Sequence, residues 1–216
     1  MTQETWQVLG LFTGAVAQRW DGRAPSAIHK TAADGTQSVT HLGLSNDAQA
    51  DLEAHGGLDK ALHQYPEDHY ADWQEEGMIP PGMRPAAFGE NISTRGLTEE
   101  TVCIGDMFRL GTALVQVSQG RQPCWKLSAH TGQEKMAYRF HKTGRTGWYL
   151  RVLEEGTVSK GQQMTLIERD KAQVSVRVAT RAVLDRKASA EELSRLVALE
   201  ALSPEWRSFF ETLKAD

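Results

Sequence analysis

Hydrophobic and polar residues alternate in short runs over the first 170 positions, which is the pattern of β-strands. Ala113, Val115 and Val117 alternate strictly, with the period of a half-buried strand. The same signal predicts further strands over 8–12, 101–110, 149–153 and 164–167. Several short strands joined by Gly-rich turns predict a barrel or a sandwich.

Helical patterns interrupt and then follow these strands. We expect one or two inserted helices, over 59–65 and 67–75, with Pro66 separating them. After Asp170 the apolar residues change to helical spacing, first over 174–184.

The last 28 residues carry two strong helix-start signals. Ser189 and Glu192 have the spacing of a capping box. Ser203-Pro204-Glu205 supplies an N-cap, a proline at the first position and an acidic first turn. The next helix has an apolar stripe, which predicts a face packed on the barrel; its residues are Trp206, Phe209, Phe210 and Leu213. We therefore expect a mainly β domain over 1–168, with its core motifs at about 36–168, and a three-helix domain over 169–216.

The composition narrows the class of protein. The 216 residues are 40% apolar and 24% charged, which is ordinary for a globular protein, and the net charge of −4 offers no basic surface for nucleic acid or anionic lipid. The apolar stretch 8–17 is broken by Gly10 and Gly14, so it predicts a strand rather than a signal peptide or a membrane span. With only two cysteines, the expected location is the reducing cytoplasm.

Cys124 is the most informative candidate for chemistry. It follows the strand predicted over 113–117, comes directly after Pro123, and lies between two cations, Arg121 and Lys126. Nearby positive charge lowers the pKa of a thiol, and the thiolate is the form that binds metals and attacks electrophiles. Cys124 could thus be a metal ligand, a covalent nucleophile or a sulfur carrier, or an inert buried thiol.

Three other segments could contribute to a site. His55-Gly56-Gly57 precedes a predicted helix start with Lys60 beside it, an arrangement that suits an anion such as phosphate. Glu90 and Asn91 follow a glycine and could project into a cavity. Arg145, between two glycines, is a plausible partner for phosphate or carboxylate.

Some kinds of site find no support. His55, His63 and His69 lack a recognised zinc spacing, and no Walker A, G-x-G-x-x-G or G-x-S-x-G pattern is present. A Cys-His dyad between Cys124 and either His55 or His130 stays open, because a sequence does not show which side chains meet.

Taken together, five ordered segments resemble the MOSC-domain proteins of the YiiM family. Gly120 departs from the family, which usually has proline there, and this could loosen the loop before the cysteine. The segments that carry the resemblance are 55–61, 88–91, 103–106, 121–127 and 144–149, and the last three predicted helices resemble the three-helix extension of the same family.

The resemblance implies a β-barrel with inserted helices that binds the molybdenum cofactor, a pterin dithiolene carrying molybdenum. Cys124 corresponds to the cysteine that ligates the metal. Glu90 and Asn91 are expected near the substrate or the pterin, as catalytic residues. The residues expected to bind the cofactor and its phosphate are His55, Lys60, Arg121, Lys126 and Arg145.

The resemblance also implies a reaction, the reduction of N-hydroxylated compounds such as hydroxylamino base analogues and amidoximes. The chain has no flavin or haem signature and no cysteine cluster, so the electrons are expected from a separate flavin or iron–sulfur reductase. Two other functions remain open. One is a sulfur carrier with a persulfide on Cys124, and the other is a binding module without catalysis.

Overall fold

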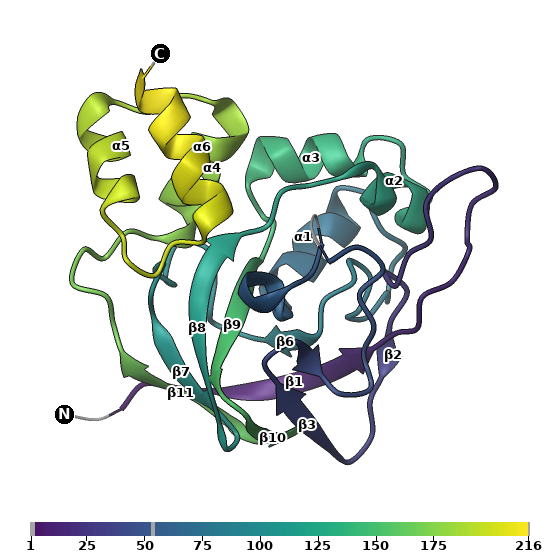
Figure 1. Cartoon of the computed structure of the whole chain (residues 1–216). Helices are drawn as coiled ribbons and strands as arrows, with labels where there is room; N and C mark the ends of the chain where they lie inside the picture. The colour runs from purple at the N-terminus through teal and green to yellow at the C-terminus, as the bar shows by residue number, and fades with distance from the viewer. Residues whose placement is uncertain (1–2, 53–54, 216) are drawn as a thin grey trace.

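The protein is a β-barrel with helices around one end and a helical extension at its C-terminus (Figure 1). The computed structural model describes residues 3–52 and 55–215. The strands in these residues are β1 Thr5–Thr13, β2 Thr31–Ala32, β3 Thr36–Thr40, β4 Gly43–Leu44, β5 Leu62–Pro66, β6 Ile92–Thr94, β7 Met107–Leu110, β8 Ala113–Gly120, β9 Trp148–Glu154, β10 Gly156–Ser159 and β11 Gln163–Glu168.

The helices in the same residues fall into two groups. The inserted helices are η1 Leu58–Lys60 (a single 3₁₀ turn), α1 Asp68–Glu75, α2 Trp125–Thr131 and α3 Met136–Thr143. The extension consists of α4 Val176–Asp185, α5 Ala190–Val197 and α6 Pro204–Ala215. No helix within the described ranges is long and apolar enough to cross a membrane.

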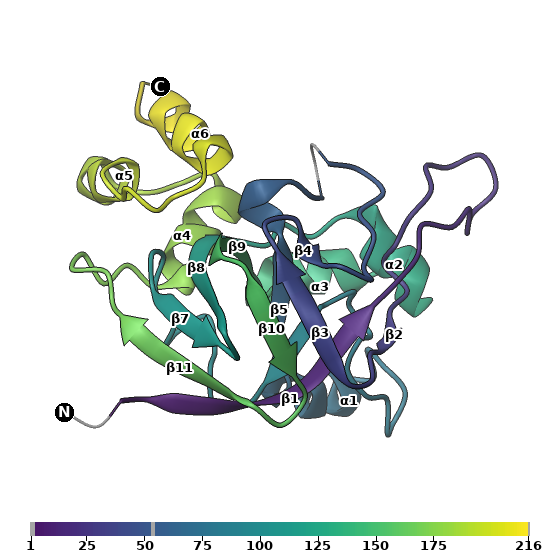
Figure 2. The same ribbon diagram turned by 60° about the horizontal axis from the view of Figure 1, so that its bottom comes forward.

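Seven strands close the barrel, in the order β1, β11, β7, β8, β9, β5 and β6. The pairing of β1 with β11 joins the two ends of this sheet, and Thr5 lies opposite Thr165. A smaller sheet, β10-β3-β4, crosses the front of the barrel in Figure 2. The expected β-barrel with inserted helices is therefore confirmed.

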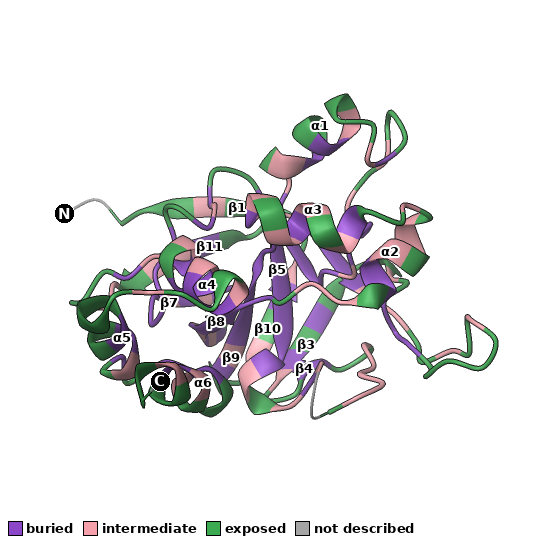
Figure 3. Ribbon diagram, turned by 90° about the horizontal axis from the view of Figure 1, so that it is seen from above, coloured by how far each residue is buried: buried purple, intermediate pink, exposed green. Residues whose placement is uncertain are grey.

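The strict alternation over 113–117 is confirmed as well. Ala113, Val115 and Val117 are buried in β8, while Leu114 and Gln116 are only half-buried. Figure 3 shows the barrel strands coloured mainly as buried, and the outer faces of α5 and α6 as exposed. The apolar residues of the barrel and those of the extension form one continuous core.

The helix predicted over 59–65 is wrong. Only the single turn η1 forms, and the next residues are β5, a strand in which all five residues are buried. β5 pairs with β6 on one side and β9 on the other, so pairing inside the barrel overrides the local helical pattern. The helix predicted over 67–75 is confirmed as α1.

The strand predicted over 101–110 is half right. Only Met107–Leu110 forms β7, because the carboxylate of Asp106 accepts a hydrogen bond from the Cys103 amide and closes a turn ahead of it. Cys103 is buried. Helices α2 and α3 had not been predicted.

The extension follows its sequence signals closely. Ser189 and Glu192 form the expected capping box at the start of α5. Pro204 is the first residue of α6, and the hydroxyl of Ser203, just before it, accepts a hydrogen bond from the Trp206 amide. α4 contacts β8, and Phe210 is fully buried, so the aromatic stripe of α6 faces the core as expected.

Candidate functional site

A cleft opens at one end of the barrel. The cleft is lined by the β1–β2 connection, the segment between β4 and η1, η1 itself and the segment just before β6. Strands β5 and β9, the β8–α2 loop and the first turn of α2 complete it. The lining residues with polar side chains are Ser26, Lys30, Asp47, Gln49, His55, Lys60, His63, Asn91, Arg121, Cys124, Lys126 and Tyr149.

Cys124 lies at the end of the β8–α2 loop, where it is the N-cap of α2 in an extended conformation. Burial raises the pKa of its thiol, but a hydrogen bond from His55, the positive charge of Arg121 and the Lys126 amide outweigh this effect and lower the pKa to about 7. A large share of Cys124 is therefore thiolate at neutral pH. Of the two possible histidine partners, His55 is the one that meets the thiol, while the His130 ring packs against His29.

Arg121 is the central cation of the cleft. Its side chain is almost fully buried and donates to the carbonyl oxygen of Phe88 at 2.7 Å. Among the described residues no carboxylate lies within ion-pair distance of its guanidinium. A buried cation without a paired acid is costly, so the site gains most from an anionic ligand.

A buried polar network forms another wall. The Lys30 ammonium pairs with Asp47, and both side chains are 6% exposed. Asn91 donates to Asp47 at 2.7 Å and accepts from the His63 amide at 3.1 Å. Burial, with the charge of Arg121, holds the pKa of His63 well below its usual value, so this imidazole is neutral. The network fixes Lys30 at the surface of the cleft.

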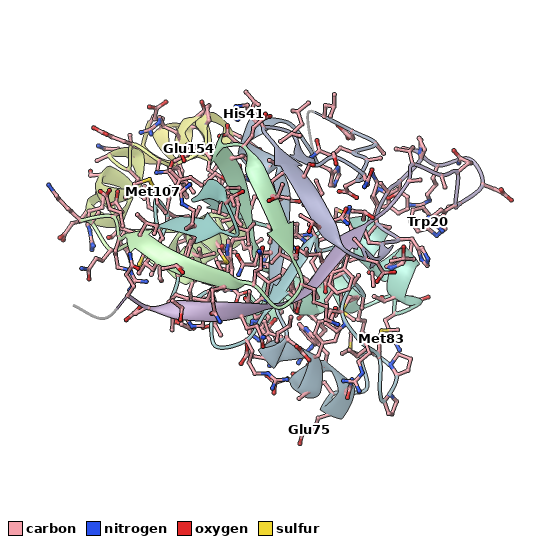
Figure 4. The ribbon with its side chains drawn as sticks, turned by 90° about the horizontal axis from the view of Figure 1, so that it is seen from below. Trp20, His41, Glu75, Met83, Met107 and Glu154 are labelled. Carbon is pink, nitrogen blue, oxygen red and sulfur yellow. The ribbon has the colours of Figure 1, made fainter. Side chains whose placement is uncertain are left out.

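Aromatic residues hold the β1–β2 connection against α2. A long connection between β1 and β2 projects beside α2, with Trp20 on the side away from the C-terminal helices (Figure 4). The Trp20 ring contacts Trp125 edge-to-face, with 5.1 Å between ring centroids, and the Arg23 guanidinium lies over Trp125. This contact holds the projecting connection against the helix that begins at Cys124.

Most of the predicted site residues come together in the cleft. The ones that line it are His55, Lys60, Asn91, Arg121, Cys124 and Lys126. His55 and Lys60 were predicted to lie beside a helix start whose amides would suit an anion. The structure does not form such a helix start, because η1 is too short to present the amides of a helix N-terminus. Gly120 does not loosen the loop either, since it is packed against the extension.

Glu90 was expected near the substrate or the pterin, but its side chain does not line the cleft. Its carboxylate is fully buried on the other side of the chain, where it accepts hydrogen bonds from the Tyr70 hydroxyl and the Phe88 amide. Burial raises its pKa in spite of these hydrogen bonds. Glu90 connects α1 to the segment below the cleft, which is a structural position.

Arg145 also lies outside the cleft. Its guanidinium pairs with Glu76 at 3.0 Å and stacks over the Trp73 ring, 4.7 Å from the ring centroid. Asp72 lies 3.6 Å away on the same helix. The charge of Arg145 is therefore already neutralised by α1, and its side chain is not available to a ligand in the cleft.

Sequence reasoning did not assign six of the polar lining residues to the site: Ser26, Lys30, Asp47, Gln49, His63 and Tyr149. Lys30 and Asp47 lie in stretches without apolar periodicity, and only the path of the chain around β1 brings them together. Tyr149 was part of a noted segment, but nothing in it distinguished this side chain from its neighbours. A buried Lys–Asp pair leaves no local signal in a sequence, because its partners lie far apart along the chain.

The donor set of the cleft tests which metal centre would fit. Within residues 3–52 and 55–215 no group of three His, Cys, Asp or Glu side chains could hold an ion by itself. The cleft instead offers one thiolate surrounded by cations. That set fits a metal that arrives with ligands and negative charge of its own, such as the dithiolene and phosphate of the molybdenum cofactor.

Comparison with known families agrees with this geometry. The family model described as MOSC domain matches residues 51–165, and the one described as YiiM-like, 3-alpha helix domain matches residues 174–215. The chain belongs to the MOSC family, in its YiiM group. It is 40% identical over 197 residues to the protein YiiM of Escherichia coli (strain K12), covering 91% of this chain and 87% of that protein.

Solved structures show the same relationship. The crystal structure of YiiM from Geobacillus stearothermophilus matches with a TM-score of 0.82 and 32% identity, over 97% of this chain and 99% of that one. The structure of YiiM from Escherichia coli matches with a TM-score of 0.79 and 32% identity, over 98% and 93%. A protein of Gibberella moniliformis named Reductase is 37% identical over 180 residues, covering 82% of this chain and 32% of that protein.

Proposed function

We propose that this protein is an oxidoreductase that uses the molybdenum cofactor to reduce N-hydroxylated compounds. The observation that carries the proposal is the Cys124 thiol, with a pKa of about 7, in a cleft lined by Arg121, Lys60 and Lys126. A soft thiolate suits molybdenum, and cations suit the phosphate of the pterin. When bound, the cofactor supplies two electrons to the N–O bond.

The residues of the chain would bind and orient that cofactor. The Cys124 sulfur would be the protein's ligand to the metal. The Arg121 guanidinium and the Lys60 and Lys126 ammonium groups would neutralise the phosphate, and His55 would keep the thiol deprotonated through its hydrogen bond. These residues fix the cofactor's place, while its own chemistry performs the reduction.

The reaction also needs protons. Reduction of an N-hydroxylated amine takes up two electrons and two protons and releases the amine and water. Nζ of Lys30 carries a proton at the wall of the cleft, and burial lowers its pKa although Asp47 opposes the shift. We therefore propose Lys30 as the ammonium group that delivers a proton to the departing oxygen.

The electrons would come from a separate flavin or iron–sulfur reductase. The Gibberella moniliformis protein named Reductase supports this arrangement, because the chain matches only 32% of its length. The remaining part of that protein lies outside the match with this chain. We propose that a second polypeptide supplies the corresponding activity here.

The first experiment is to measure molybdenum and pterin in protein purified from cells that make the cofactor. Near-stoichiometric molybdenum in the wild type, lost in Cys124→Ser and kept in the control Cys103→Ser, would support the proposal. Reduction of an N-hydroxylated purine and an amidoxime, with a chemical electron donor, is then the activity to assay. Absence of molybdenum with cyanide-releasable sulfur on Cys124 would instead support a sulfur carrier.

A further inference from the structure

The three-helix extension reaches the cleft through one carboxylate. Glu205, in the first turn of α6, lies with its Oε2 atom 2.5 Å from Nζ of Lys60. The Lys60 side chain is 7% exposed and lines the cleft, whereas Glu205 is 49% exposed. An acid from the extension therefore contacts a cation of the site.

Hydrogen bonds hold this contact in place. The Ser203 amide, just before α6, donates to the carbonyl oxygen of Ser118 at 3.0 Å. The Ser118 hydroxyl donates to the carbonyl oxygen of Asp59, the residue before Lys60. The start of α6, strand β8 and the turn η1 are thus joined, so the position of Glu205 relative to Lys60 is set by backbone as well as by charge.

Gly120 brings the extension close to the Cys124 loop. A Cβ atom at this position would lie 2.0 Å from Oγ1 of Thr180 on α4 and 2.9 Å from a ring carbon of Trp206 on α6. This close approach lies directly before Arg121. A larger residue here would require the side chain of Thr180 or Trp206 to shift.

The charge of Glu205 is felt on the wall of the cleft. Burial raises the pKa of Tyr149; Arg121 opposes this rise, and the negative charges of Cys124 and Glu205 add to it. Tyr149 is itself a lining residue of the cleft. Glu205 therefore contributes to the potential of the site although it belongs to another part of the fold.

We propose that Glu205 is a positioning residue, which holds the Lys60 ammonium at the cleft and takes the place of the ligand's anionic group until the ligand binds. Lys60 has three N–H donors and can turn from the carboxylate toward a phosphate. The proposal rests on the proposed function only in assigning an anionic, phosphate-bearing ligand to the cleft. The extension then regulates how strongly the site attracts that anion.

The local potential is measured by alkylating Cys124 in metal-free protein. Iodoacetate is an anion and iodoacetamide is neutral, and both attack the same thiolate, so the ratio of their rates reports charge and cancels the thiolate fraction. Peptide mapping separates Cys124 from Cys103. We expect Glu205→Gln to raise the ratio about two- to tenfold, because it removes a negative charge that pairs with a cation of the cleft.

Matched variants distinguish this role from a purely structural one. Glu211→Gln removes an exposed charge further along the same helix and should leave the ratio unchanged. Glu205→Asp keeps the charge and should restore the wild-type ratio. An unchanged ratio in Glu205→Gln, or an equal rise in Glu211→Gln, would overturn the proposal.

Inorganic phosphate provides the second readout, by calorimetric titration of the same metal-free proteins. Glu205→Gln should bind phosphate several-fold more tightly at low salt, and this gain should vanish in a Lys60→Met background. Weaker phosphate binding, or the same gain without Lys60, would contradict the proposal that Lys60 exchanges the Glu205 carboxylate for the anion of the ligand. Both assays omit molybdenum, so they separate failure of this inference from failure of the cofactor assignment.

Discussion

Two arginines, each in a glycine-containing loop, have opposite surroundings in this molecule. Arg121 is buried in the cleft, where it donates to a backbone carbonyl and has no carboxylate in ion-pair distance among the described residues. Arg145 lies over Trp73, and Glu76 and Asp72 neutralise it. Both loops have the composition expected of an anion site, but only Arg121 can serve one.

The difference shows that neighbouring carboxylates decide whether an arginine is available to an anionic ligand. The Arg145 region is a structural cluster of aromatic rings, in which Trp73 stacks on Phe140 with 5.3 Å between centroids. The Arg121 guanidinium, by contrast, has no carboxylate partner within the part of the chain that the structure describes. The stability of the fold is therefore expected to depend on the Arg145 region, and ligand binding on the Arg121 region.

The largest expected effect is in the aromatic cluster. Trp73→Ala removes a fully buried ring that stacks on Phe140 and donates to the Tyr65 hydroxyl, so the free energy of unfolding should fall by about 3–5 kcal/mol. Chemical denaturation measures this loss. If the two regions are separate, the fraction that stays folded should keep the pKa of Cys124 near 7; a large rise in that pKa would show that the cluster shapes the cleft.

The next effect concerns the charge of the cleft. In metal-free Arg121→Gln, the pKa of Cys124 should rise from about 7 toward the free value of about 8.5, because the guanidinium no longer stabilises the thiolate. The wild-type alkylation rate should increase with pH through a midpoint near 7, and the variant's midpoint should lie higher. A variant midpoint still at 7 would mean that His55 alone lowers the pKa.

The smallest effect is expected at the other arginine. Arg145→Gln breaks partly exposed ion pairs with α1 and a contact with Trp73, so the free energy of unfolding should fall by about 1 kcal/mol. Molybdenum content and the Cys124 midpoint should match the wild type. A lower molybdenum content in this folded variant would mean that Arg145 contributes to cofactor binding, and the contrast with Arg121 would then be wrong.

The sequence predicted well the elements whose signals are local. The caps at Ser189 and Ser203 and the alternation in β8 are fixed by neighbouring residues, and the structure contains all of them. Cys124 was identified because its proline and its flanking cations are adjacent in the chain. Its histidine partner was left open between His55 and His130, since only the fold decides which one approaches.

The parts that could not be predicted depend on distant residues. β5 has a helical pattern by itself and becomes a strand because β6 and β9 pair with it. The Lys30–Asp47 pair needs the loop around β1 to close. The different environments of Arg121 and Arg145 likewise arise from α1 and the segment around Phe88, which no local pattern near either arginine describes.

The seam between β1 and β11 has a consequence for synthesis of the chain. Thr5 pairs with Thr165, so one edge of the first strand stays open until β11, the last strand of the barrel in chain order, has been made. Pairings this distant in sequence form slowly, and an open strand edge invites contact with other chains. A nascent chain that has not yet reached β11 is thus the stage at which this protein is most exposed to aggregation, and where a chaperone would help most.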